Sequence, residues 1–150
     1  MSVSNGVIVI NQWKEITKAG NKAFRQGRDN TAKQLYLFAC HRAVKLFPHW
    51  FDGDAATAAL VISYQNLADL YLRQSNHSDM LVVYKELLKQ LQDFDNSNRF
   101  NIDSTYRRIG TEITAKLKDV NFKSTESVEL FNVLLNEYFN PTNHLIRDQN

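Results

Sequence analysis

Apolar residues recur at intervals of three and four between residues 60 and 91, in two runs separated by a polar break at 74–78. This spacing is typical of amphipathic helices, each with one apolar face. The apolar positions are Leu60, Tyr64, Leu67, Ala68 and Tyr71 in the first run, and Met80, Val83, Tyr84, Leu87, Leu88 and Leu91 in the second. Because each stripe can leave water only by packing on a partner, the pattern predicts an antiparallel helical hairpin.

The same periodicity predicts two further hairpins, so the expected fold class is all-α. Helices are expected at about 11–26, from a cap at Asp29 or Asn30 to the region before Pro48, and from an Asp54 cap to Arg73. Three more helices are expected. One runs from a cap at Ser75, Asn76 or Ser78 to about residue 94, one spans about 102–118, and one runs from 124 or 125 to the stop at 140–141. The predicted organisation is a lead-in at 1–10, one helical domain at 11–139 and a tail at 140–150.

The first two hairpins repeat one another at an offset of 48 residues. This offset relates Gly20 to Ala68, Gly27 to Ser75, Ala32 to Met80, Tyr36 to Tyr84, and Ala39 to Leu87. A constant offset that holds across both helices indicates one packing plan used twice.

The segment GNKAFRQGRDNTAKQLYLFA, residues 20–39, resembles a tetratricopeptide (TPR) unit in the spacing of its glycine, alanine, phenylalanine and tyrosine residues. Residues 66–88 resemble a second unit, with Met80 and Leu87 where the family has small residues. The third hairpin matches through Ile109, Gly110 and Ile113. The resemblance implies three antiparallel helical hairpins stacked as a short TPR-like right-handed array. The offset of 48 exceeds the usual repeat of about 34, so the second helices and connectors are expected to be longer.

In TPR-like arrays the first helix of each hairpin lines a concave groove that holds a peptide. The positions that correspond to this peptide-binding groove are Lys14, Lys18, Asn21, Phe24, Arg25, Gln65, Asn66, Asp69, Arg73, Arg107 and Arg108. Basic residues predominate, which favours an acidic partner segment, and Asn21 and Asn66 are expected to bond the peptide backbone. The resemblance thus implies a non-catalytic protein–protein interaction module, an adaptor or a chaperone-like protein. The simpler explanation of the same charges is that they keep exposed helix faces solvated.

Composition supports a small globular protein: 150 residues suit one domain, and a net charge of +2 is too small to indicate nucleic acid by itself. RNA or single-strand binding through Lys14, Lys18, Arg25 and the arginines at 107 and 108 is an alternative that ranks below peptide binding, because few aromatic residues are interleaved. The single cysteine, Cys40, excludes an intrachain disulfide and is expected to be a buried apolar residue. No signal peptide and no apolar run of membrane length are found, so a cytoplasmic location without membrane contact is expected.

No catalytic pattern is found, and we expect no enzyme activity, cofactor or metal. The four histidines are scattered, and Asp52-Gly53-Asp54 fits a turn and helix cap better than a calcium loop.

Three aromatic residues in one connector, Phe47, Trp50 and Phe51, form a possible contact patch for a partner or a homodimer. Packing beneath the connector is the other explanation. A structural homo-oligomer, joined through Trp50 and the sixth helix, therefore also stays open.

Overall fold

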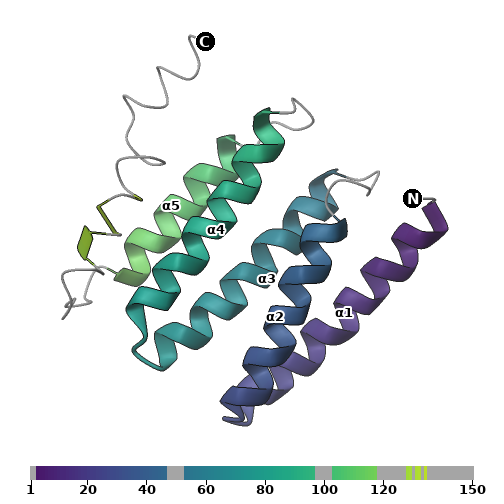
Figure 1. The fold of residues 1–150 in the computed structure, drawn as a ribbon, viewed down its shortest axis with the longest axis horizontal. Coiled ribbons are helices and arrows are strands. Elements are labelled where there is room, and N and C mark those ends of the chain that lie inside the picture. The colour runs from purple at the N-terminus through teal and green to yellow at the C-terminus, as the bar shows by residue number, and fades with distance from the viewer. Residues whose placement is uncertain are drawn as a thin grey trace. The chain divides into compact units, whose positions relative to one another are not determined.

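The computed structural model describes the backbone of residues 3–46, 53–96, 103–117, 128–129, 131–132 and 134. Five helices are defined in it: α1 (Val3–Arg25), α2 (Asp29–Leu46), α3 (Gly53–Arg73), α4 (His77–Asn96) and α5 (Asp103–Leu117). The described residues outside the turns are all helical, which confirms the all-α class (Figure 1).

The chain divides into two compact units, Met1–Gln90 and Leu91–Asn150. The first contains α1, α2, α3 and α4 as far as Gln90, and the second contains the end of α4 and all of α5. The predicted domain at 11–139 therefore spans both units. In the second unit, Ile109 and Ile113 are buried along one side of α5 as the sequence predicts. Of the predicted sixth helix, the described residues are 128–129, 131–132 and 134, and all of them are helical.

The first helix starts earlier than its pattern suggests. It begins at Val3, so most of the lead-in predicted at residues 1–10 is helical. Val9 and Ile10 are half-buried, and no proline interrupts the segment, so the helix can continue toward the N-terminus from the stripe that starts at Trp13.

The turns that follow α1 and α3 have the same geometry. Gly27 and Ser75 both have left-handed backbone angles, with φ of 72° and 57°. After α1, the amide of Gly27 donates to Phe24 and that of Arg28 to Ala23, a Schellman arrangement that ends the helix. The eight backbone hydrogen bonds around the two turns form four pairs, each related by the offset of 48 residues. The repeat predicted from the sequence is therefore present in the backbone.

Helices α1 and α2 run antiparallel and approach closely at Gly20. A methyl group added at Gly20 would lie 2.8 Å from ring atoms of Tyr36, so only glycine allows this approach without displacement. Ala23, Ala32 and Ala39 are fully buried in the same pair of helices. Small residues thus bring the two backbones together.

Helices α1 and α3 run side by side in the same direction (Figure 1). Near the start of this seam, the Trp13 indole Nε1 donates to Ser63 Oγ at 2.6 Å. Near its end, Arg73 Nη1 donates to the carbonyl oxygen of Phe24 at 2.7 Å. These two contacts join residues 50 and 49 positions apart, close to the repeat offset of 48. Equivalent helices of the two repeats are therefore neighbours.

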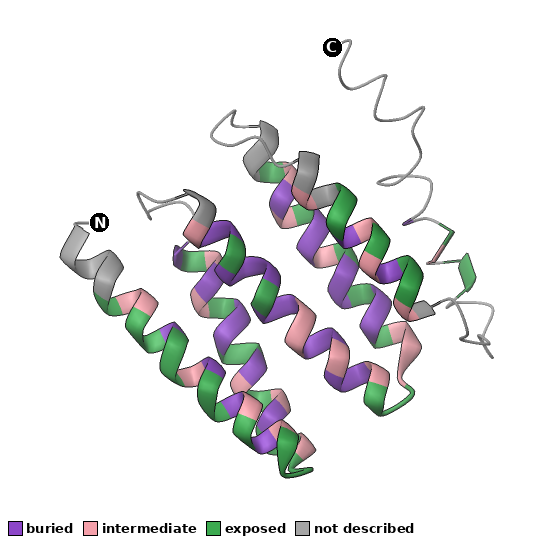
Figure 2. Ribbon diagram, turned by 180° about the vertical axis from the view of Figure 1, so that it is seen from behind, coloured by how far each residue is buried: buried purple, intermediate pink, exposed green. Residues whose placement is uncertain are grey.

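The core of the first unit centres on α3, which is buried along much of its length (Figure 2). Leu60, Leu67 and Leu70 of α3 are buried, as are Tyr84 and Leu87 of α4. Cys40 is also buried, which confirms the expectation for this residue. No helix in the described part of the chain is long and apolar enough to cross a membrane.

Candidate interaction surface

Two rows of side chains adjoin along the seam between α1 and α3. Helical spacing places Lys14, Lys18, Asn21 and Arg25 on one face of α1, and the register of the seam brings them beside the exposed side of α3. Together these rows make up the α1–α3 face. Its members are Lys14, Lys18, Asn21 and Arg25 of α1, and Ile62, Gln65, Asn66, Asp69 and Arg73 of α3.

The hydroxyl of Tyr36 reaches this face from α2. It donates a hydrogen bond to Asn21 Oδ1 at 2.8 Å. Burial raises the pKa of Tyr36; Asp69 raises it further, whereas Arg73 and Arg25 act in the opposite direction. Of the residues that the sequence assigns to the groove, Asn21 thus bonds this phenol group directly, and Arg25, Asp69 and Arg73 act on its pKa through their charges. From the sequence, Tyr36 is identified only as a repeat position, although a buried tyrosine hydroxyl needs a polar partner.

Arg73 is engaged within the protein. Its guanidinium lies 3.6 Å from the centroid of the Phe24 ring, and Nη1 donates to the Phe24 carbonyl oxygen. Nη2 pairs with the carboxylate of Asp29 in the first turn of α2, and Gln74 donates to the other oxygen of that carboxylate at 3.4 Å. Arg73 therefore joins the end of α3 to the turn between α1 and α2. Phe24 also makes contacts within the protein, since its ring packs on Tyr36 as well as on Arg73.

Asn66 is a polar residue in the α3 row of this face. The register of 49–50 residues places it at the level of Thr17, whose side chain is buried with an exposed fraction of 8%. Thr17 Oγ1 has no hydrogen-bond partner in the described part of the chain. Asn66 is half-buried, and its side-chain amide carries two donors and an acceptor. Asn66 thus offers groups able to bond the backbone of a bound peptide, whereas the Thr17 hydroxyl is buried within the seam.

Ile62 is the apolar member of this face and was missed by the sequence analysis. Its exposed fraction is 41%, and it precedes Asn66 by one helical turn. The signal was available, because an isoleucine stands on the side of α3 that otherwise carries Gln65, Asn66 and Asp69.

The remaining predicted contact residues lie elsewhere. Arg107 and Arg108 are exposed on α5, in the second unit. The aromatic patch of Phe47, Trp50 and Phe51 lies outside the described residues. Within the described residues, no three His, Cys, Asp or Glu side chains gather in a way that could hold a metal ion.

Charge is distributed unevenly along the chain. Residues 3–46 contain eight lysines and arginines but only Glu15 and Asp29 as acids, a formal charge of +6 against +2 for the whole chain. Glu15 pairs with Lys18 at 3.7 Å, and both side chains are largely exposed, so this pair contributes little stability. Lys14 and Arg25 form no ion pair with any described residue. The α1–α2 pair is therefore a basic surface.

The chain matches the model of a family described as "Protein of unknown function (DUF2753)" over residues 11–121. The match covers most of the chain, including all of α2, α3, α4 and α5. No curated protein and no solved structure matches the chain.

Proposed function

We propose that this chain, which belongs to the DUF2753 family, is a non-catalytic protein–protein interaction module of TPR-like architecture. In this proposal it serves as an adaptor or chaperone-like protein. It binds a segment of its partner on the α1–α3 face, and the partner segment is acidic.

The observation that carries this proposal is the repetition of the turn geometry at the offset of 48 residues. Two units with the same turns, whose first helices lie side by side at a register of 49–50 residues, are what stacked helical hairpins require. Such stacking lines up equivalent helices along one surface, and this surface is where helical-repeat proteins hold their ligands.

Each part of the face has a chemical role in this proposal. Asn21 Oδ1 is taken by Tyr36, which leaves the Asn21 amide N–H groups to donate to a peptide carbonyl. Asn66 offers both a donor and an acceptor. Ile62 supplies an apolar contact, whereas Lys14 and Arg25 attract acidic side chains. Backbone bonding gives affinity in this arrangement, and charge selects the partner.

The test compares two matched substitutions of exposed aliphatic residues. Ile62→Asp changes the α1–α3 face, whereas Val82→Asp makes a similar change on α4 outside it, at an exposed fraction of 53%. Tagged full-length chains carrying each change capture partners from a lysate of the native cell, and mass spectrometry quantifies the captured proteins. We expect a partner that binds the wild-type and Val82→Asp chains, is lost with Ile62→Asp and is reduced by Asn66→Ala.

Circular dichroism spectra of the variants establish that each remains folded. If Ile62→Asp and Val82→Asp capture the same proteins in the same amounts, the α1–α3 face is not the binding surface. Alanine variants of Arg107 and Arg108 are tested in the same way. If these lose a partner that every other variant retains, the second unit carries the function instead.

A further inference from the structure

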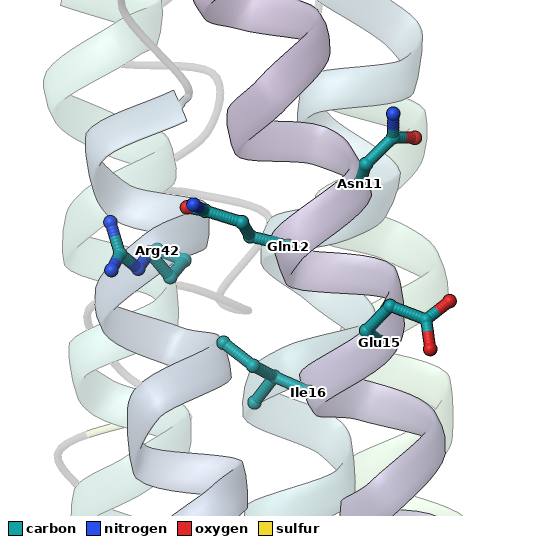
Figure 3. Close-up of a pocket in the computed structure, with 5 residues that line it drawn as sticks. All are labelled: Asn11, Gln12, Glu15, Ile16 and Arg42. Atoms are coloured by element: carbon teal, nitrogen blue, oxygen red, sulfur yellow. The ribbon is translucent and has the colours of Figure 1, made fainter.

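A second groove lies between α1 and α2, and it does not include the α1–α3 face. It has a volume of about 490 Å³ and is lined by Asn11, Gln12, Glu15, Ile16 and Arg42 (Figure 3). On α1, the positions that contact α3 are Trp13 and Phe24. Gln12 and Ile16 are one helical turn apart and lie on a different side of α1, the side that borders α2.

Arg42 is the charged centre of this groove. It is half-buried, and it forms no ion pair and no hydrogen bond with any described residue. The Gln12 side chain points toward it, whereas the Glu15 carboxylate points away and is paired with Lys18 (Figure 3). The Arg42 guanidinium therefore has donors available to a ligand in this open groove. A carboxylate from a ligand would accept two parallel hydrogen bonds from it.

Exposed apolar side chains lie one helical turn before two of the groove residues. Ile8 precedes Gln12 by one turn of α1 and has an exposed fraction of 54%. Phe38 precedes Arg42 by one turn of α2 and has an exposed fraction of 56%. Ile16 lines the groove together with Arg42, whereas Phe38 lines a separate hollow on α2. Such a combination fits a ligand with an apolar side and a negative charge.

The groove suits a peptide better than a small molecule. Small-molecule sites enclose most of their ligand, whereas this groove is open at the surface between two helices. Amphipathic helices bind in grooves of this kind through their apolar face. The charge of +6 on residues 3–46 selects an acidic helix over a basic one.

We propose that the groove between α1 and α2 binds an acidic amphipathic helix of a partner protein, with Arg42 donating hydrogen bonds to one of its carboxylates and Ile16 contacting its apolar face. This is a second binding surface, and it does not depend on the function proposed for the α1–α3 face.

The test uses a defined probe and the full-length chain. The probe is a fluorescein-labelled synthetic helix with leucine on one face and glutamate on the other, and its binding is followed by fluorescence anisotropy. A second probe carries glutamine in place of glutamate. We expect the acidic probe to bind more tightly than the neutral one, and Arg42→Gln to weaken it about tenfold, or about 1.4 kcal/mol. Ile16→Ala is expected to weaken both probes.

Lys45→Gln is the matched control, because it removes one positive charge from an exposed position on the same helix outside the groove. We expect it to change the dissociation constant by less than about twofold, as for an exposed charge. Equal losses for Arg42→Gln and Lys45→Gln would overturn the proposal, since net charge alone would then explain binding. It would also be overturned if the wild-type chain bound neither probe, or if Ile62→Asp abolished binding while Arg42→Gln left it unchanged.

Discussion

Replacing Gly20 by alanine tests whether close approach of α1 and α2 holds the first unit together. Two effects with opposite signs compete. Alanine is favoured over glycine inside a helix by about 1 kcal/mol, so the change alone would stabilise α1. The added methyl group would lie 2.8 Å from Tyr36 Cδ1 and Cε1, about 1 Å inside the normal contact distance between carbon atoms.

The Tyr36 ring is poorly placed to move away. Its exposed fraction is 2%, its hydroxyl is bonded to Asn21, and its ring packs on Phe24. Insertion of a methyl group into a well-packed core costs about 1–3 kcal/mol. We therefore expect Gly20→Ala to lower the free energy of unfolding by about 1 kcal/mol net, in urea titrations followed by far-ultraviolet circular dichroism.

A double-mutant cycle makes the reasoning refutable. In a Tyr36→Leu background the ring is absent, so Gly20→Ala should change sign and stabilise the chain by up to about 1 kcal/mol. Ala19→Gly, at an exposed position of the same helix, measures the helix propensity without the clash. If Gly20→Ala is stabilising in the native background, or if its effect is the same with and without the ring, close approach of the helices is not the reason for the glycine.

Two further predictions concern the second turn and the buried thiol. Ser75→Gly should raise the free energy of unfolding by about 1 kcal/mol in the same urea titration, because Ser75 has a φ of 57° that disfavours side chains with a Cβ atom; an unchanged midpoint would contradict this. Burial raises the pKa of the Cys40 thiol from its ordinary 9.0 to about 12, so the unfolded chain releases this proton first as the pH rises. The free energy of unfolding should therefore fall between pH 9 and pH 12, and fall less in Cys40→Ala, in urea titrations across that range; identical pH profiles would refute the assignment.

Local signals in the sequence predict much of the fold. The helical class, the ends of α1 and α3, and the matched turns follow from apolar spacing and from Gly27 and its equivalent Ser75, since these effects act over a few residues. The sequence offers three candidates for the N-terminal cap of α4, and Asn76 is the one whose side-chain oxygen accepts a hydrogen bond from the Asp79 amide. The start of α1 was placed too late, because the apolar residues at its N-terminus lack the spacing of an amphipathic stripe.

The candidate site was harder to predict, because its contacts depend on how α1 and α3 are aligned. Sequence spacing placed Arg73 on the same face of α3 as Asn66 and Asp69 but could not show that the register brings it onto Phe24 and Asp29. The same register lets the charge of Asp69 raise the pKa of Tyr36. Helical periodicity predicts which face of its own helix a residue occupies. The residue that it contacts on the neighbouring helix depends on how the two helices are aligned, and the sequence pattern leaves this alignment uncertain by a residue or two. Arg42 was missed for the same reason, since only the packing of α2 on α1 places it in a groove.

The seam between α1 and α3 is closed by a hydrogen bond at each end, from Trp13 to Ser63 and from Arg73 to Phe24. Two attachments this far apart prevent the helices from rotating about either one, so the spacing between their side chains is set before any partner arrives. A bound segment then loses its own conformational entropy but does not have to order the surface that receives it. Binding to such a preorganised surface is expected to gain affinity mainly through slower dissociation, and association should proceed without a conformational step in this protein.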